Sequence, residues 1–150
     1  MSLARLLRKY LSGSEIFIPE QRVIMRRYIV FDCNCFGIYI HHLCGRDHES
    51  LHNHPWKWSL AFVIAGFYSE DRATADNGIV RRLIRSGRIN FISQNTFHRI
   101  NDVSPKGAWT IYIHGPRAQR DGFLIRISEA WIYRDAKEVT LEATRPTKVS

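Results

Sequence analysis

Two histidines, His52 and His54, are separated by a single residue in a segment that we expect to be extended. In an extended segment, residues i and i+2 point to the same face, so both imidazoles can reach one metal ion. A third nitrogen must come from elsewhere, and His98 follows the turn-like sequence Ser93-Gln94-Asn95 at the start of a strand-like segment. Three imidazoles can hold a divalent ion and leave positions open for water or substrate.

Five further residues are candidates for substrate binding or for support of the three histidines: Arg46, Asp47, Ser59, His114 and Arg117. Asp47 could add a carboxylate ligand, although an aspartate in such a turn more often caps local backbone or pairs with a neighbouring arginine. His114 ends an expected strand, where it could point inward as a fourth ligand or as a donor to a ligand. We expect it instead to lie exposed in a turn.

The chain is strongly basic, with a formal net charge of +8, so its surface should attract anions. Most of this charge is arginine, which suits bidentate recognition of carboxylate or phosphate. Two groups of arginines flank the segment that contains His98: Arg81, Arg82, Arg85 and Arg88, then Arg117, Arg120 and Arg126. A solvated basic face is the plainer interpretation of any one of them. The expected ligand is a small anion; nucleic acid fits the charge alone, because no helix-turn-helix or zinc-finger spacing is present.

The chain length of 150 residues suits one domain, and its periodicity is mainly that of strands. We expect a short amphipathic helix over residues 1–14, an all-β domain over 15–143 and a flexible tail over 144–150. The polar stretch from Glu70 to Asn77 is expected to be a turn. Strands are expected near residues 16–18, 23–31, 36–43, 58–68, 79–84, 88–92, 108–114, 122–127 and 130–133, with another beginning at His98.

Cellular location is suggested by what the sequence lacks. No run of about 20 apolar residues is present, so we expect no membrane span, and no secretory signal is recognised at the N-terminus. Cys33, Cys35 and Cys44 cannot all pair within one chain, which favours reduced thiols buried in the core. These features predict a cytoplasmic protein.

The histidine spacing resembles the two motifs of the cupin superfamily over roughly residues 45–102. His52, His54, Ser59 and Gly66 fall at the places of the first motif, and Gly87, Ser93, Asn95, His98 and Asp102 at those of the second. The departures are that Ser59 replaces the usual glutamate ligand and that Ser93 and Asn95 replace proline and glycine. The sequence Arg46-x5-His52-x-His54-Pro55-Trp56 also resembles small uncharacterised cupins of bacteria and phages.

This resemblance implies a cupin-type double-stranded β-helix, a jelly-roll barrel, with its metal inside. A three-histidine set is similar to that of the thiol dioxygenases, which implies an Fe(II) oxygenase of a small anionic substrate, with Zn, Mn or Ni as alternative ions. A cupin that has lost its metal, with His52 and His98 as hydrogen-bonding groups or bases, is the competing interpretation. The alternatives in function are a metal-free sugar-nucleotide isomerase or epimerase and a non-catalytic module that binds a nucleotide or another anion. A homodimer is also compatible with the resemblance.

Overall fold

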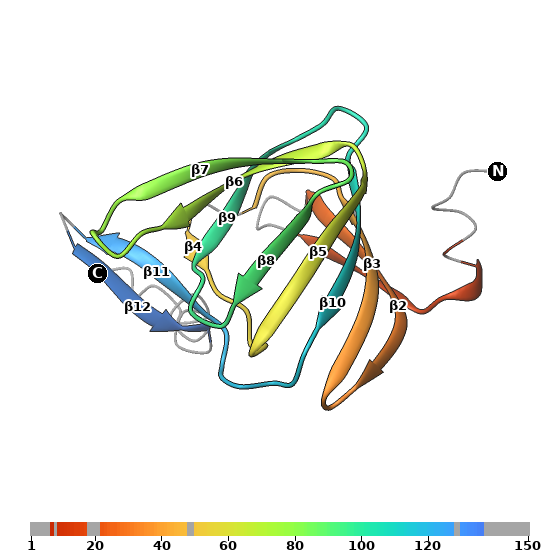
Figure 1. Ribbon diagram of the computed structural model, residues 1–150, viewed down its shortest axis with the longest axis horizontal. Coiled ribbons are helices and arrows are strands. Elements are labelled where there is room, and N and C mark those ends of the chain that lie inside the picture. The colour runs from red at the N-terminus through yellow and green to blue at the C-terminus, as the bar shows by residue number, and fades with distance from the viewer. Residues whose placement is uncertain (1–6, 8, 18–21, 48–49, 128–129, 137–150) are drawn as a thin grey trace, which may run out of the picture.

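The computed structural model describes residues 7, 9–17, 22–47, 50–127 and 130–136. Within these ranges, twelve β-strands form two antiparallel sheets of six strands each. Figure 1 shows the two sheets facing each other, one across the right of the view and the other across its left and top. The expected all-β jelly-roll barrel is therefore confirmed.

Each sheet combines strands that are far apart in the sequence. The first, sheet A, has the order β1 (Gly13–Phe17), β2 (Val23–Cys33), β3 (Phe36–Leu43), β10 (Ala108–His114), β5 (Trp58–Ala65) and β8 (Ile89–Ser93). The second, sheet B, has the order β12 (Ala130–Asp135), β11 (Gly122–Ile127), β4 (Leu51–His52), β9 (His98–Val103), β6 (Phe67–Ala73) and β7 (Ile79–Arg85).

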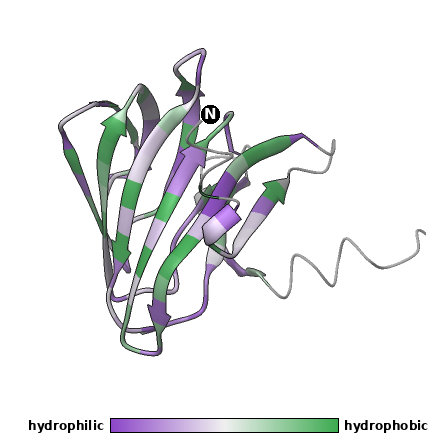
Figure 2. Ribbon diagram, turned by 90° about the vertical axis from the view of Figure 1, so that its right-hand side faces the viewer, coloured by the Kyte–Doolittle hydropathy of each residue, from purple (hydrophilic) through white to green (hydrophobic). Residues whose placement is uncertain are grey.

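The core lies between the sheets and follows the two-residue period of strands. Alternate residues of β3 and β10 are buried, and those of β5 follow the same pattern over its first six residues. One buried cluster contains Leu43, Val63, Tyr68, Ile84 and Ala108. Many strands carry apolar residues over much of their length, as the green stretches of Figure 2 show. That pattern leaves apolar side chains on the outside of the barrel as well as inside it.

The strands match the expected ones closely, with two corrections. The expected strand over residues 58–68 is two strands, because Gly66, at a φ of 77°, turns the chain between β5 and β6. The expected turn from Glu70 to Asn77 is also wrong for its first four residues, which belong to β6. Glu70 and Asp71 are buried there because arginines on the same or neighbouring strands pair with both carboxylates.

The two ends of the chain fall largely outside the described residues, including most of the expected helix over residues 1–14 and the whole tail over 144–150. The amide of Leu11 donates to the carbonyl of Leu7 at 2.8 Å, and β1 begins at Gly13. In the described part of the chain, none of the helical residues form a segment long and apolar enough to cross a membrane.

The expectation of buried thiols is wrong for two of the three cysteines. Cys33 and Cys35 are exposed, with their Sγ atoms 3.4 Å apart, at the two-residue turn that joins β2 to β3. The sequence Asp32-Cys33-Asn34 is itself a turn signal, and a hairpin tip is accessible to solvent. Only Cys44 is half-buried.

Asp71 joins three strands on the outer face of sheet B. Its carboxylate accepts hydrogen bonds from Arg81 on β7 at 2.8 Å and from Arg99 on β9 at 3.1 Å. Arg99 therefore points away from the barrel interior, as expected from its position next to His98. The hydrogen bond from Arg81 lowers the pKa of Asp71 against the opposing effect of burial.

We predict that Asp71→Asn lowers the free energy of unfolding at pH 7 by about 1.5–3 kcal/mol, the range for hydrogen bonds to a charged group. Because the folded pKa of Asp71 lies below the unfolded value, this stabilisation is present above about pH 4 and disappears as the pH falls through the folded pKa. Urea unfolding of both proteins between pH 7 and pH 3 measures the difference. A difference that stays constant over this range would show that the ion pairs contribute nothing.

Candidate metal centre

Three imidazoles converge inside the barrel. The pairing of β4 with β9 places His52 directly opposite His98, and His54 follows two residues later. The ring centroids lie 5.5 Å apart for His52 and His54, 5.0 Å for His52 and His98, and 5.1 Å for His54 and His98. One ring nitrogen of each lies within 4.8 Å of the others. The structure thus brings together the three histidines that the sequence singled out.

The segment between the first two histidines is fixed by its neighbour in sheet B. The backbone amide of Asn53 donates to the carbonyl of Gly122 at 3.1 Å, and the Asn53 side-chain oxygen accepts from the Gly122 amide at 2.8 Å. Leu51 and Asn53 are buried on the other side of this short extended segment. His52 and His54 are consequently turned toward the same space.

The buried carboxylate of Glu70 orients the third histidine. Nδ1 of His98 lies 2.9 Å from Oε2 of Glu70, and because an ionised carboxylate only accepts, Nδ1 is the donor. The lone pair of His98 is then on Nε2, which lies 2.8 Å from Nε2 of His54. Such a carboxylate behind a histidine is the usual support of a metal ligand.

Glu70 is fully buried and lies within a network that reaches both sheets. Nε of Arg72 donates to its Oε1 at 2.5 Å, and Nδ2 of Asn90, on β8 of the opposite sheet, donates to its Oε2 at 3.0 Å. Arg72 also donates to the side-chain oxygen of Asn90 at 2.7 Å. Burial alone would raise the pKa of Glu70, but His98 and Arg72 outweigh burial and lower it. The carboxylate is therefore ionised at neutral pH.

The two histidines from the β4 segment are held neutral. Burial lowers the pKa of His52 to about 4, against the opposing charge of Asp47. Burial, followed by the neighbouring His98 and His52, lowers the pKa of His54 well below its ordinary value. Neutral imidazoles keep the lone pairs that a metal ion requires.

The geometry suits a mononuclear site. Two nitrogens that each lie about 2.0–2.1 Å from one ion are roughly 3 Å apart, close to the 2.8 Å between His54 and His98. A ring nitrogen of His52 lies within 4.8 Å of the other two. In the part of the chain that the structure describes, the group of possible metal ligands consists of the three histidines and includes no carboxylate.

Two of the other candidate residues, Asp47 and Ser59, are not members of the three-histidine group. Oδ2 of Asp47 is 3.9 Å from Nε2 of His52, and the same oxygen accepts the backbone amide of Ile100 at 2.9 Å. Asp47 therefore braces the chain against β9 beside His52. Ser59 is fully buried on β5, and its hydroxyl donates to the carbonyl of Ile92 at 3.5 Å.

His114 is buried, which corrects the expectation that it lies exposed in a turn. It is the last residue of β10 on the inward-facing side, where Nδ1 lies 2.8 Å from the carbonyl of Gly115 and Nε2 lies 3.0 Å from the hydroxyl of Tyr39. Its ring stacks on Trp56 at 3.6 Å, and only a glycine, Gly37, fits opposite it on β3. His114 thus fills one end of the barrel and is not in the three-histidine group.

The arginines singled out from the sequence lie on the outside. Arg46 and Arg117 are exposed, and Arg117 makes only a loose ion pair with Asp121 at 3.7 Å. Arg81, Arg82, Arg85 and Arg88 are exposed as well, in agreement with a solvated basic face.

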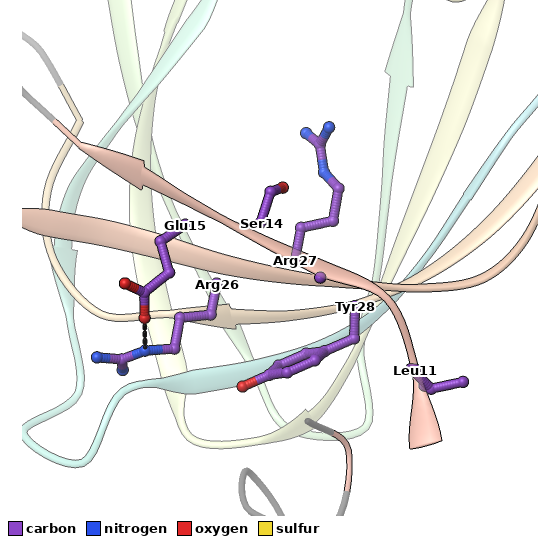
Figure 3. Close-up of a pocket in the computed structure, with 7 residues that line it drawn as sticks. Leu11, Ser14, Glu15, Arg26, Arg27 and Tyr28 are labelled. Carbon is purple, nitrogen blue, oxygen red and sulfur yellow. Dashed lines mark hydrogen bonds and ion pairs between the residues drawn. The ribbon is translucent and has the colours of Figure 1, made fainter. Parts of the chain in front are cut away.

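A different arginine, Arg27 on β2, faces the interior. Figure 3 shows its side chain on the opposite side of the strand from Arg26 and Tyr28. In the register of β2 with β3 it pairs with His41, whose side chain is buried in the barrel. The sequence analysis did not single out Arg27, although its position within an alternating strand, one residue from Arg26, is a signal that it faces the opposite side from its neighbour.

The guanidinium of Arg27 lies among aromatic and histidine side chains. Its Nε donates to Nε2 of His41 at 3.3 Å, and it lies over the ring of Tyr39 at 5.2 Å. Burial and the charge of Arg27 lower the pKa of His41 to about 3, so this histidine is neutral and accepts the hydrogen bond. His41 stacks on Tyr112 at 4.8 Å, and Tyr112 lies beside His54 at 6.0 Å. Arg27 makes no ion pair with any carboxylate in the ranges that the structure describes.

No protein-family model and no curated protein matches the sequence, but many solved structures share the fold. An Fe(II) form of HppE in complex with its substrate aligns with a TM-score of 0.57 and 9% identity over 71% of this chain and 57% of that one. Oxalate decarboxylase from Bacillus subtilis, described with Mn(II) centres, aligns with a TM-score of 0.53 and 14% identity over 69% of this chain.

The chain spans only 57% of the HppE chain and 29% of the decarboxylase chain, so it corresponds to a part of each. An uncharacterised conserved protein with a double-stranded β-helix domain from Klebsiella pneumoniae has a similar extent. It aligns with a TM-score of 0.56 and 14% identity over 80% of this chain and 95% of that one. The two facing sheets and these similarities show that the chain has the double-stranded β-helix fold.

Proposed function

We propose that this protein binds one divalent metal ion on His52, His54 and His98 and acts on a small anionic molecule inside the barrel. The observation that carries the proposal is the convergence of three imidazole nitrogens, one of them on a ring that a buried carboxylate orients. Structural neighbours described with Fe(II) and with Mn(II) support a divalent ion. Such an ion supplies Lewis-acid or redox chemistry at the positions that three protein ligands leave open.

Within this proposal, an Fe(II)-dependent oxygenase is the specific activity that we favour. Imidazole ligands suit iron, zinc, copper and nickel, so the ligand set by itself does not select among these ions. The described part of the site also contains no thiolate that would favour a structural zinc ion. Activity therefore has to be tested with each metal separately.

Arg27 is the residue that we propose to bind the anionic group of the substrate. It is a cation on the inner face of β2, it donates a hydrogen bond to the neutral ring of His41, and its charge contributes to the lowered pKa of His54. A guanidinium in this position can form paired hydrogen bonds with a carboxylate or phosphate. The stacked aromatic rings of Tyr39 and Tyr112 lie on the same wall of the barrel.

We predict that protein purified without added metal, and then supplied with Fe(II), Mn(II), Ni(II) or Zn(II), retains close to one ion per chain after desalting. His54→Ala should lose at least about tenfold in metal affinity, because two ligands hold an ion far less tightly than three. His42→Ala is the matched control, since His42 lies on the outer face of β3 and stacks on Trp109. Elemental analysis of the three proteins is the measurement.

Absence of metal from the wild-type protein after reconstitution would contradict the proposal. Catalytic turnover of a sugar nucleotide by the metal-free protein would instead favour the isomerase or epimerase. For the oxygenase, the readout is oxygen uptake by the iron-loaded protein over a panel of small carboxylic and phosphonic acids, with no uptake in the zinc-loaded form.

We predict that Glu70→Gln weakens metal binding by about 10–100-fold while all three ligands remain, the usual effect of removing a carboxylate behind a ligating histidine. Asp71→Asn is a close control, because it makes the same chemical change at the next residue, whose side chain points to the outer face. Metal affinity is measured by competition with a chelator, and circular dichroism checks the fold. Equal affinity of the two variants would show that Glu70 does not act through His98.

We predict that Arg27→Gln weakens binding of malonate and of inorganic phosphate to the metal-loaded protein by about 10–100-fold, the equivalent of a lost charge-assisted hydrogen bond. Metal content should not change. Arg26→Gln is the matched control, because Arg26 lies on the other side of β2 and pairs with Glu15 at 2.8 Å. Isothermal titration calorimetry measures both variants. If Arg26→Gln reduces anion binding as much as Arg27→Gln does, the anion binds to the outer basic surface.

A further inference from the structure

The tip of the β2–β3 hairpin carries two of the three cysteines of the chain. Cys33 ends β2 and pairs with Phe36 at the start of β3, so Asn34 and Cys35 form the turn between the strands. Figure 1 shows this turn at the lower end of the orange hairpin. Both cysteines are exposed, and their Sγ atoms lie 3.4 Å apart. The hairpin tip therefore presents two thiols in contact with each other and with solvent.

These two thiols can form a disulfide without any change in the strands. Cα atoms two residues apart are separated by at most about 7 Å in a fully extended chain, and a turn brings them closer. Disulfides accept Cα separations of about 4.4–6.8 Å. A bond of about 2.05 Å requires the Sγ atoms of Cys33 and Cys35 to approach each other by about 1.4 Å. Rotation of two exposed side chains is enough for such an approach.

The surroundings of the two sulfur atoms differ. The backbone amide of Cys35, its thiol and the backbone amide of Phe36 lower the pKa of the Cys33 thiol. The hydrogen bond with Cys33 raises the pKa of the Cys35 thiol. Backbone amides directed at one sulfur stabilise a negative charge there, as they do at other anion-binding turns. Cys33 is thus the nucleophile of the pair, and Cys35 is the protonated thiol beside it.

The third cysteine, Cys44, has neither property. It is half-buried, and burial raises the pKa of its thiol. Nη1 of Arg26 donates to its Sγ at 3.2 Å. An accessible thiol of lowered pKa with a second cysteine next to it is the arrangement found in redox-reactive cysteines, whereas buried single cysteines are inert. Reactivity toward disulfides is therefore expected at the hairpin tip and not at Cys44.

We propose that Cys33 and Cys35 form a thiol–disulfide exchange site that reduces small disulfides. The Cys33 thiolate attacks one sulfur of the small disulfide, forms a mixed disulfide and releases the other sulfur as a thiolate. Cys35 then loses its proton to solvent and attacks the Cys33 sulfur, so the remaining thiolate leaves and the Cys33–Cys35 disulfide forms. The two thiols supply the two electrons, and the released thiolates take up protons from solvent. This reaction involves no residue of the three-histidine group, so it is independent of the proposed function.

Oxidised glutathione tests this proposal, because it is a small disulfide whose carboxylates suit a chain with a formal net charge of +8. The full chain, reduced and purified without added metal, is incubated with it under nitrogen at pH 7 and quenched with acid. Mass spectrometry of the intact protein should show a loss of two hydrogen atoms and no bound glutathione. Alkylation after unfolding should find Cys44 as the only free thiol. Cys44→Ser is the matched control, and its hairpin should react as in the wild type.

Two further variants separate the roles of the two cysteines. Cys35→Ser should stop at the mixed disulfide and gain one glutathionyl group on Cys33. Cys33→Ser should react about tenfold more slowly than Cys35→Ser, because the thiolate fraction gained at a lowered pKa exceeds the loss in intrinsic nucleophilicity. Circular dichroism shows that both variants are folded. Equal rates for the two variants, a wild-type protein that keeps glutathione, or three thiols still free after incubation would each overturn the proposal.

Discussion

A carboxylate that is buried away from water must accept hydrogen bonds from nearby donors. The buried carboxylate of Glu70 meets this requirement with donors from both sheets of the barrel. Its donors come from sheet B through Arg72 and His98 and from sheet A through Asn90, so satisfying one charge ties the two sheets together. The same hydrogen bonds determine which nitrogen of His98 carries its lone pair. Removing one partner of such a network leaves another buried group unpaired, which costs far more than a surface contact. The fold and the candidate site thus depend on the same group.

The strands could be read from the sequence because their alternation and their turn residues are local properties. The three histidines were also recognisable, since His52 and His54 need only extended backbone to share a face, and His98 has the spacing of a second motif. Glu70 was missed because a run of polar residues is read as a loop. This polar run forms a strand because β6 pairs with β7, which carries arginines, and with β9, which carries His98. Local composition contains no information about such partners.

Arg27, the residue that we propose to bind the substrate anion, was missed for a related reason. Runs such as Arg81-Arg82 and Arg85 attract attention because they are dense, yet density of charge is typical of a solvated face. Arg27 is isolated on the inner side of its strand, and its significance depends on the register of β2 with β3, which the sequence does not specify. A half-buried cation beside a neutral histidine is more informative about a ligand than an exposed cation, because partial removal from water is costly without an anionic partner.

In β3 and β10 of sheet A, the side chains on the inner face differ in kind from those on the outer face. In β3, Tyr39 and His41 line the interior whereas Ile38 and Ile40 point to the outer face, and β10 repeats this arrangement with Tyr112 and His114 inside. Since neither β3 nor β10 contains an acidic residue, a lysine or an arginine, hydrophobicity by itself would not distinguish the correct register of these two strands from one shifted by a single residue. The inward side chains that bear polar atoms make the distinction: a shift would move Tyr39, His41 and His114 from their hydrogen-bonding partners into the outer apolar surface. The polar lining of the barrel therefore selects the strand register as well as forming the site.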